Sequence, residues 1–273
     1  MIHSRLLPLV TASVLVSCGA PMTDVAPTDP PPTEGGAIVF AQQQISAESG
    51  DCADDGPHCA TVQVDTLETL GGGNSAVREN IDLYLAHDLI SRLRSFLPEE
   101  HASRANTADA LAAEFLAQHR AFVAEFPDSP ARWSIEITAK ARYNTASVAT
   151  IDITEFAYTG GAHPNTRRRL VSFDIASGNL IGVEDLTTDT GELATMVENQ
   201  LRADRGLGLE DDLEAAGFWL PEGGFALPDN LGIVADGVLF HWDSYEIAPD
   251  AMGPIDVMVP AADLTEIVSP RFW

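Results

Sequence analysis

One stretch of the chain decides the fold class: VATIDITEFAY, from Val148 to Tyr158. Hydrophobic and polar residues alternate along it, which is the pattern of a strand that buries one face. A second alternating run, from Trp133 to Ile137, precedes it, and the chain breaks between the two at Asn144. Neighbouring alternating runs separated by a short break are typical of antiparallel strands. We therefore expect an antiparallel sheet in this part of the chain.

Other strands are expected on both sides of this pair. In the run from Ala60 to Leu67, Val62 and Val64 alternate with polar residues, which predicts one buried face. Asp236-Gly237 lies between two short apolar runs and is a strong signal of a type I′ hairpin. The remaining predicted strands are Ile38 to Ile45, Arg169 to Ile175 and Ile255 to Val259.

Three helices are predicted from apolar residues at helical spacing. The first begins after Gly71-Gly72-Gly73, with Asn74 or Ser75 as its cap, and the second runs from Thr107 to a stop at Pro127. The third begins at a capping box of Asp189 and Glu192 and ends at Gly206. Helices packed on mainly antiparallel sheet define an α+β fold, and we see no internal repeat.

The N-terminus has the layout of an export signal. Arg5 precedes an apolar run from Leu6 to Val16, which is too short to span a bilayer as a stable helix. The residues Leu15-Val16-Ser17-Cys18 resemble the lipobox of bacterial lipoproteins, in which the cysteine becomes the acylated N-terminus, with chains such as palmitate. An ordinary secretory peptide is the alternative, but no A-x-A site precedes Cys18. We therefore expect Cys18 to anchor the protein in a membrane through its lipid.

The segment that follows is expected to be a tether. It carries five prolines among small polar residues and cannot bury a core. Gly19, in place of Asp, resembles the residue found in lipoproteins sorted to the outer membrane, so we expect an outer-membrane protein that faces the periplasm. Cys52 and Cys59 are an even pair in such an oxidising compartment, and we expect them to form a disulfide across a short turn.

The chain is strongly acidic, with a net charge of -26 and a single lysine, Lys140. This charge argues against nucleic acid as a partner, because nucleic-acid binding requires basic patches. It favours cationic partners, since a negative field raises their encounter rate. The alternative is a general acidic bias in a salt-adapted or GC-rich organism, which the even spread of the acids along the chain favours.

Two motifs are candidates for function. In YTGGAHPN the pair Gly160-Gly161 permits a sharp loop that presents His163 and Asn165, and Tyr158 precedes it. The second motif runs from Tyr245 to Pro254 and follows the predicted hairpin strand. The predicted binding residues are Tyr158, Gly160, Gly161, His163, Asn165, Tyr245 and Glu246.

These motifs, with FDIASGNLI from Phe173 and DGVLFHWDSYEIAPDAMGPIDVMVPAADL from Asp236, resemble the extracytoplasmic domain of RsiV-like proteins. That family includes lysozyme-sensing anti-sigma factors, an N-terminal region of a peptidoglycan deacetylase and envelope lipoproteins. The resemblance runs from about Ile38 to the C-terminus and implies a two-lobed α+β body. It also implies a non-catalytic recognition role, with a lysozyme-type muramidase as a partner. It does not extend to the sigma-binding segment, the transmembrane helix or the deacetylase domain of those relatives.

We accordingly divide the chain into four parts. Residues 1–17 are a lipoprotein signal peptide and residues 18–36 a lipidated, proline-rich tether. Residues 37–130 form an N-terminal α+β lobe, and residues 131–273 a C-terminal RsiV-like α+β lobe.

Catalysis is the competing hypothesis. His163, His241, Asp243, Glu246 and Asp250 are the residue types of an acid/base or metal site. No established catalytic motif is present, however, so we expect a non-enzymatic protein without cofactor or metal, which binds a protein or cell-wall ligand. The alternative is a peptidoglycan- or glycan-active hydrolase that uses His163 and Glu246.

The run Arg167-Arg168-Arg169 is the one basic cluster of the sequence. On a strand, Arg167 and Arg169 share a face and Arg168 points to the other. We expect a solvated face paired with local carboxylates; binding of an anionic glycan or lipid headgroup is the alternative.

Overall fold

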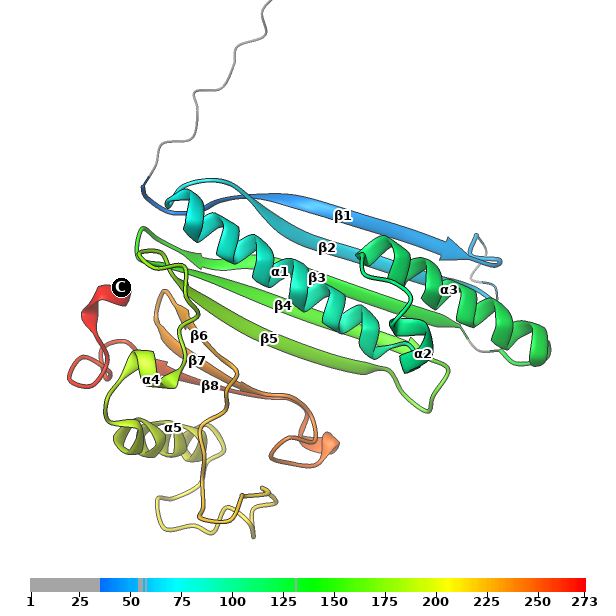
Figure 1. The fold of residues 1–273 in the computed structure, drawn as a ribbon. Coiled ribbons are helices and arrows are strands. Elements are labelled where there is room, and N and C mark those ends of the chain that lie inside the picture. Colours follow the sequence, from blue (N-terminus) through cyan, green and yellow to red (C-terminus); the bar gives the residue numbers. More distant parts are fainter. Residues whose placement is uncertain (1–34, 54–55, 57, 131) are drawn as a thin grey trace, which may run out of the picture. The chain divides into compact units, whose positions relative to one another are not determined.

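The computed structural model describes residues 35–53, 56, 58–130 and 132–273 (Figure 1). The predicted signal peptide, Cys18 and the tether up to residue 34 lie outside the described residues. Among the helices of the described part, none is long and apolar enough to cross a membrane. Two sheets and the helices packed on them make up an α+β fold, as the sequence predicts.

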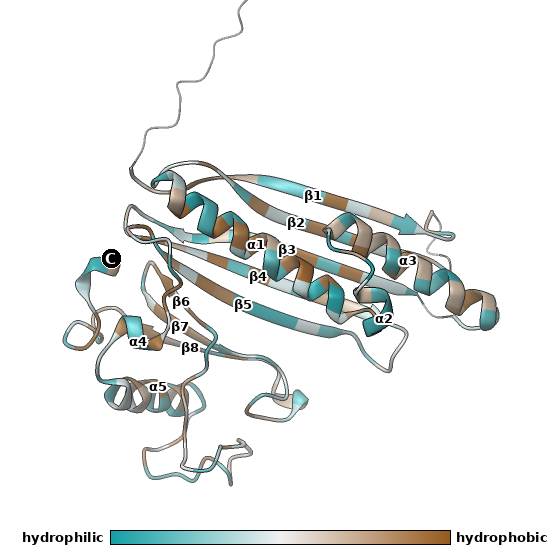
Figure 2. Cartoon of the chain, in the orientation of Figure 1, coloured by the Kyte–Doolittle hydropathy of each residue, from teal (hydrophilic) through white to brown (hydrophobic). Residues whose placement is uncertain are grey.

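The first sheet has five strands in the order β1-β2-β3-β4-β5. Their bounds are β1 Val39–Ser49, β2 Ala60–Gly71, β3 Trp133–Asn144, β4 Val148–Thr159 and β5 Asn165–Asp174. Hydrophobic and polar residues alternate in short bands along these strands (Figure 2). All neighbours are antiparallel except β2 and β3, which pair in parallel. A parallel pair needs a long crossover, and the chain makes it through three helices.

Those helices are α1 Ser75–Ser95, α2 Glu99–Ala102 and α3 Ala108–Glu125, and they cover one face of the sheet (Figure 1). The side chain of Asn74 caps α1 by accepting a hydrogen bond from the Val77 amide, 3.0 Å away. The apolar stripe of α1 is buried against Val62, Val64 and the inward residues of β3 and β4. This is the first hydrophobic core, and it contains the buried face predicted for β2.

The second sheet has three strands, β6 Leu231–Val234, β7 Gly237–Trp242 and β8 Ile255–Pro260, which pair antiparallel in that order. A hairpin joins β6 to β7 as predicted, but its turn is not the expected type I′ turn at Asp236-Gly237. Gly237 pairs with Val234, so the turn residues are Ala235 and Asp236, and neither has the positive φ that type I′ requires. At Gly237 φ is 157°, and a Cβ there would lie 2.0 Å from the carbonyl oxygen of Val259, so only glycine fits. The second core lies between this sheet and its flanking short helices, α4 Val183–Leu186, α5 Thr190–Asp204, η1 Asp250–Met252 and η2 Pro270–Phe272.

The two sheets meet at β4 and β5. Ala149 and Ile151 belong to the first core, whereas Val148 belongs to the second, so the first half of β4 is buried on both faces. Gly232 of β6 approaches closely here, because a Cβ at that position would lie 3.0 Å from Leu170 and 3.1 Å from Thr150. The buried hydroxyl of Ser172 accepts a hydrogen bond from the Ile233 amide at 3.0 Å. The second sheet is therefore fixed to the back of the first by close packing and a hydrogen bond.

The boundary between the two cores differs from the expected lobe boundary at residue 130. The pairing of β2 with β3 crosses that position, so β3, β4 and β5 complete the N-terminal sheet. The second core takes most of its residues from Ile181 onward. The physical reason is the crossover through α1 to α3, which returns the chain to the same sheet and not to a new one.

The predicted disulfide is confirmed. Cys52 and Cys59 are bonded, with their Cα atoms 4.7 Å apart, in the loop that joins β1 to β2.

Candidate functional site

The two sequence motifs meet at one cavity of about 600 Å³. One wall is the β4–β5 loop with the start of β5, including His163, Pro164 and Asn165. The other wall is the segment that follows β7, including Tyr245 and Gly253. We call this cavity the loop cleft. It brings together three of the predicted binding residues, His163, Asn165 and Tyr245.

The other predicted binding residues lie elsewhere. Gly160 and Gly161 are exposed in the turn that joins β4 to β5, and Gly160 has a φ of 84°. Tyr158 lines a separate cavity together with Trp133. Glu246 lines a third, polar cavity that does not include His163. The two residues of the hydrolase hypothesis therefore face different cavities.

Tyr245 has a backbone conformation that side chains rarely adopt. Its φ is 68°, and among the described residues it is the one non-glycine with positive φ. Its side chain is 57% exposed at the mouth of the loop cleft. Such strain costs on the order of 1–3 kcal/mol and persists only where the surrounding structure holds it. The fold therefore keeps an unfavourable backbone conformation at Tyr245, and this conformation leaves the aromatic ring exposed to solvent.

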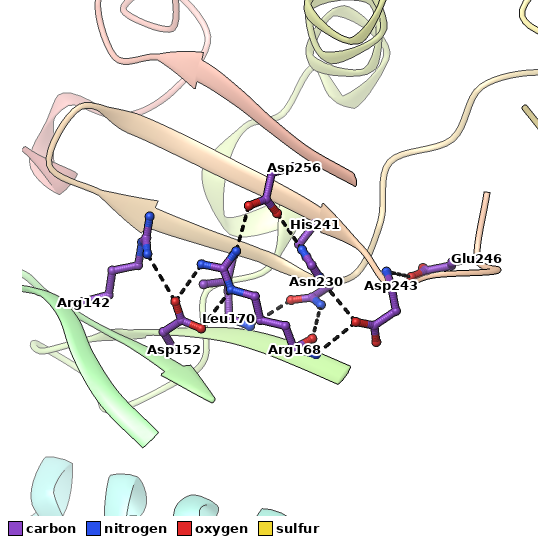
Figure 3. Close-up of polar contacts among 9 residues, drawn as sticks. All are labelled: Arg142, Asp152, Arg168, Leu170, Asn230, His241, Asp243, Glu246 and Asp256. Atoms are coloured by element: carbon purple, nitrogen blue, oxygen red, sulfur yellow. Dashed lines mark hydrogen bonds and ion pairs between the residues drawn. The ribbon is translucent and has the colours of Figure 1, made fainter. Parts of the chain in front are cut away.

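His241 lies at the back of the cleft and is buried, at 3% exposed. Its Nδ1 lies 2.6 Å from Asp256 Oδ1 and its Nε2 lies 3.0 Å from Asp243 Oδ1 (Figure 3). Burial by itself lowers the pKa of His241, but the hydrogen bonds and charges of the two carboxylates outweigh it and raise the pKa to about 9. At neutral pH the ring is an imidazolium whose two N–H groups both donate to carboxylates.

Arg168 extends this network from the second sheet to the first. Its Nε donates to Asp152 Oδ1 at 2.9 Å, and another nitrogen donates to Asp256 Oδ2 at 2.8 Å. Arg142 forms a further ion pair with Asp152 at 3.2 Å. Charges of opposite sign thus alternate from β3 and β4 through β5 to β7 and β8, as Figure 3 shows. We call these residues the charge network; its members are Arg142, Asp152, Arg168, His241, Asp243 and Asp256.

Two side chains also form hydrogen bonds with backbone groups on the outer edge of β5. Asp243 Oδ1 accepts the Arg168 amide at 2.9 Å. The amide side chain of Asn230 accepts from the Leu170 N–H at 2.8 Å and donates to the Arg168 carbonyl at 2.6 Å. An edge strand presents unpaired backbone groups, and here two side chains take the place of a neighbouring strand. The first half of β5 is thereby held rigidly at the cleft.

This arrangement favours a structural role for His241 over a catalytic one. Both nitrogens of His241 are occupied, so its imidazolium has no free position from which to accept a proton from a ligand. His163 is exposed, and its Nδ1 lies 3.0 Å from the Pro164 carbonyl oxygen. In the described part of the chain, no group of three or more His, Cys, Asp or Glu residues is arranged to hold a metal ion. The cleft is suited to holding a ligand against an exposed ring.

Sequence reasoning identified three of the six residues of the charge network. His241 and Asp243 were candidates for chemistry, and Arg168 was expected to pair with local carboxylates, which it does. Arg142, Asp152 and Asp256 were not singled out, nor was Asn230 beside the network. A signal was present for two of them, because each acid stands between two apolar residues in a strand, as in Ile151-Asp152-Ile153 and Ile255-Asp256-Val257.

The fold and the site together define a two-sheet α+β domain with a loop cleft. Residues 184–262 match the family described as "Protein of unknown function (DUF3298)", and residues 58–166 match the family described as "Deacetylase PdaC". The PdaC match covers β2 to β4 with their helices, and the DUF3298 match covers the second sheet. The two matches support the expected resemblance at the level of these domain families.

Two crystal structures have a similar fold. A DUF3298 family member from Bacteroides fragilis is 17% identical, with a TM-score of 0.67 over 88% of this chain and 96% of that one. A DUF3298 family protein from Pseudomonas aeruginosa PAO1 is 19% identical, with a TM-score of 0.59 over 86% of this chain and 96% of that one. No curated protein matches the chain significantly. At these identities the likeness shows the fold alone.

Proposed function

We propose that this protein is a non-catalytic binding protein of the cell envelope, and that the loop cleft binds a protein ligand. The observation that carries the proposal is Tyr245, an exposed aromatic ring held at positive φ beside a cavity of about 600 Å³. Exposed aromatic residues are the usual anchors of protein interfaces. Strained residues cluster at such sites because function maintains them.

The charge network supports binding over hydrolysis. It fixes both walls of the cleft, since Asp243 belongs to the segment after β7 and Arg168 to β5. A preorganised cleft binds more tightly because less conformational entropy is lost on binding. The hydrolase alternative requires His163 and Glu246 in one cleft, and they line two different cavities.

The partner is inferred to be a basic protein of the lysozyme type. The net charge of -26 attracts cationic proteins, and the resemblance to RsiV-like domains supports a muramidase in particular. The lipobox at Cys18 supports a lipid anchor, and Gly19 supports the outer membrane as its location. In this arrangement the body meets its partner in the periplasm.

Titration calorimetry against a C-type lysozyme tests the binding proposal. We expect binding that persists at physiological salt, because aromatic and polar contacts remain when long-range charge is screened. Tyr245→Ala should weaken it at least tenfold, chiefly by a faster dissociation rate. Trp219→Ala is the matched control, since Trp219 is also exposed, at 48%, but does not line the cleft. No detectable heat would contradict the binding proposal. Binding that disappears at physiological salt would show only non-specific charge attraction.

The anchor is tested separately by Cys18→Ala. We expect this variant to move from the membrane fraction to the soluble fraction after cell breakage, because its lipid anchor is lost. Retention of the variant in the membrane fraction would contradict the lipoprotein proposal without affecting the cleft.

A further inference from the structure

One edge of the first sheet is open in the described part of the chain (Figure 1). β1 is the outermost strand and pairs on one side alone, with β2. At the opposite edge, Asn230 and Asp243 bond the backbone of β5. Among the described residues, no side chain bonds the backbone of residues 40–48 in this way. The outward N–H and C=O groups of β1 are therefore available to another strand.

β1 also lacks the features that usually protect an edge strand. It has 11 residues, about twice the common length of a strand. Edge strands are commonly protected by lysine, by proline or by a bulge that twists the edge away. β1 has no proline and no basic residue, and its one register shift lies at its start, between Val39 and Phe40. From Phe40 to Ser49 its register with β2 is continuous, which leaves a regular edge.

The charge of this edge differs from that of the whole chain. The chain has 41 acids, but Glu48 is the one charged residue of β1. A cationic peptide would therefore meet a single carboxylate on this strand. Two acidic copies, in contrast, repel each other least where their surfaces are nearly neutral. The edge is accordingly better suited to a second copy of this chain than to a basic partner.

The middle of β1 is self-complementary. Gln42, Gln43 and Gln44 are consecutive and exposed. A glutamine amide both donates and accepts hydrogen bonds, so it can pair with a glutamine on a neighbouring strand. The side chains of Gln42 and Gln43 form no hydrogen bond with the described residues, and Gln44 uses only its N–H, which donates to Asp65 at 2.6 Å. An antiparallel two-fold centred on Gln43 places all three glutamines opposite glutamines.

We propose that β1 pairs with β1 of a second copy across a two-fold at Gln43, which joins the two five-stranded sheets into one. In this register Glu48 lies opposite Ile38 of the second copy, so the two carboxylates do not meet. The contact uses both open edges and closes the assembly as a dimer. The dimer goes beyond the proposed binding function, and it leaves the loop clefts accessible because they lie at β5, the opposite edge of the sheet.

Sedimentation equilibrium of the full chain, purified in detergent, tests the dimer. Gln43→Lys and Gln43→Glu should each weaken dimerisation at least tenfold, because like charges then face each other at the two-fold. A mixture of the two variants should dimerise again, since lysine then faces glutamate. Gln63→Lys is the matched control, because Gln63 is exposed on β2, an interior strand.

Three outcomes of this experiment would overturn the proposal. The first is a wild-type chain that stays monomeric at submillimolar concentration. The second is a pair of Gln43 variants that dimerise as the wild type does. The third is a mixture of the two that stays monomeric. Lysozyme binding by Gln43→Lys should equal that of the wild type, so the failure of either proposal can be told from the failure of the other.

Cross-linking in intact cells tests the same pairing in the envelope. Gln43→Cys places two thiols opposite each other at the two-fold, within reach of a disulfide, whereas Cys52 and Cys59 are already bonded to each other. Mild oxidation should give a band at twice the mass of the chain on a non-reducing gel. Gln63→Cys and the wild type should not give this band. An equal band from Gln63→Cys, no band from Gln43→Cys, or a product with another protein would contradict the pairing.

Discussion

Asn230 is the side chain whose loss should most clearly show how the two sheets are joined. It is 8% exposed and stands just before β6. Its amide bonds to the N–H of Leu170 and to the carbonyl of Arg168, both on the outer edge of β5. Asn230→Ala removes these two hydrogen bonds and leaves both backbone groups without a partner.

The expected cost follows from those two groups. A buried donor or acceptor that loses its partner costs about 1–3 kcal/mol. Leu170 is 2% exposed, so its N–H should cost near the upper end of this range. The bond to the Arg168 carbonyl is only partly buried, and Arg168 lines the cavity that Glu246 also lines, so water can replace the lost donor at a lower cost. We therefore expect a loss of about 2–4 kcal/mol in the free energy of unfolding.

Urea-induced unfolding, followed by tryptophan fluorescence, measures this loss. Asn179→Ala is the matched control, because Asn179 is exposed and its side chain forms no hydrogen bond with the described residues. The control should change stability by less than about 0.5 kcal/mol. A loss below about 1 kcal/mol for Asn230→Ala would refute the view that its side chain substitutes for a strand on β5.

Three further predictions concern stability. The pKa of His241 is raised to about 9, so its stabilising effect is complete below the unfolded value near pH 6.5 and is lost as the pH rises through 9. Urea titrations should show a fall on the order of 3 kcal/mol across this window, and a His241→Gln variant should lack it. Replacement of Cys52 and Cys59 by serine should cost about 2.5 kcal/mol, because the short loop is no longer closed; an unchanged urea midpoint would argue otherwise. Gly237→Ala should cost more than about 2 kcal/mol by thermal unfolding, since its Cβ would collide with Val259; a thermal midpoint equal to that of the wild type would show that the hairpin tolerates a side chain.

Most elements of the fold were predictable because their patterns are local. The stripe on α1, the cap at Asn74, the stop before Pro127 and the hairpin at Gly237 each depend on residues close in sequence. The parallel pairing of β2 with β3 was not predictable in this way. It joins residues separated by three helices, and nothing within either strand distinguishes a parallel neighbour from an antiparallel one.

The site was predictable only in part for the same reason. Both motifs contain turn residues that mark them as loops, so their exposure followed from sequence. Their meeting in one cleft depends on how the second sheet packs on β4 and β5, and Gly232 sets that approach. Asp152 and Asp256 lie more than a hundred residues apart in the chain, and only the folded structure shows that Arg168 joins them.

The measurement that tests the central claim most directly is hydrogen–deuterium exchange of the protein with and without a C-type lysozyme. If the loop cleft is the binding site, exchange should slow at residues 163–168 and 243–254, the two walls of the cleft. Exchange along the distant edge strand β1 should stay unchanged, because β1 lies at the other side of the first sheet. Protection at β1 or elsewhere without protection of both walls, or no protection at a saturating concentration of lysozyme, would contradict the account.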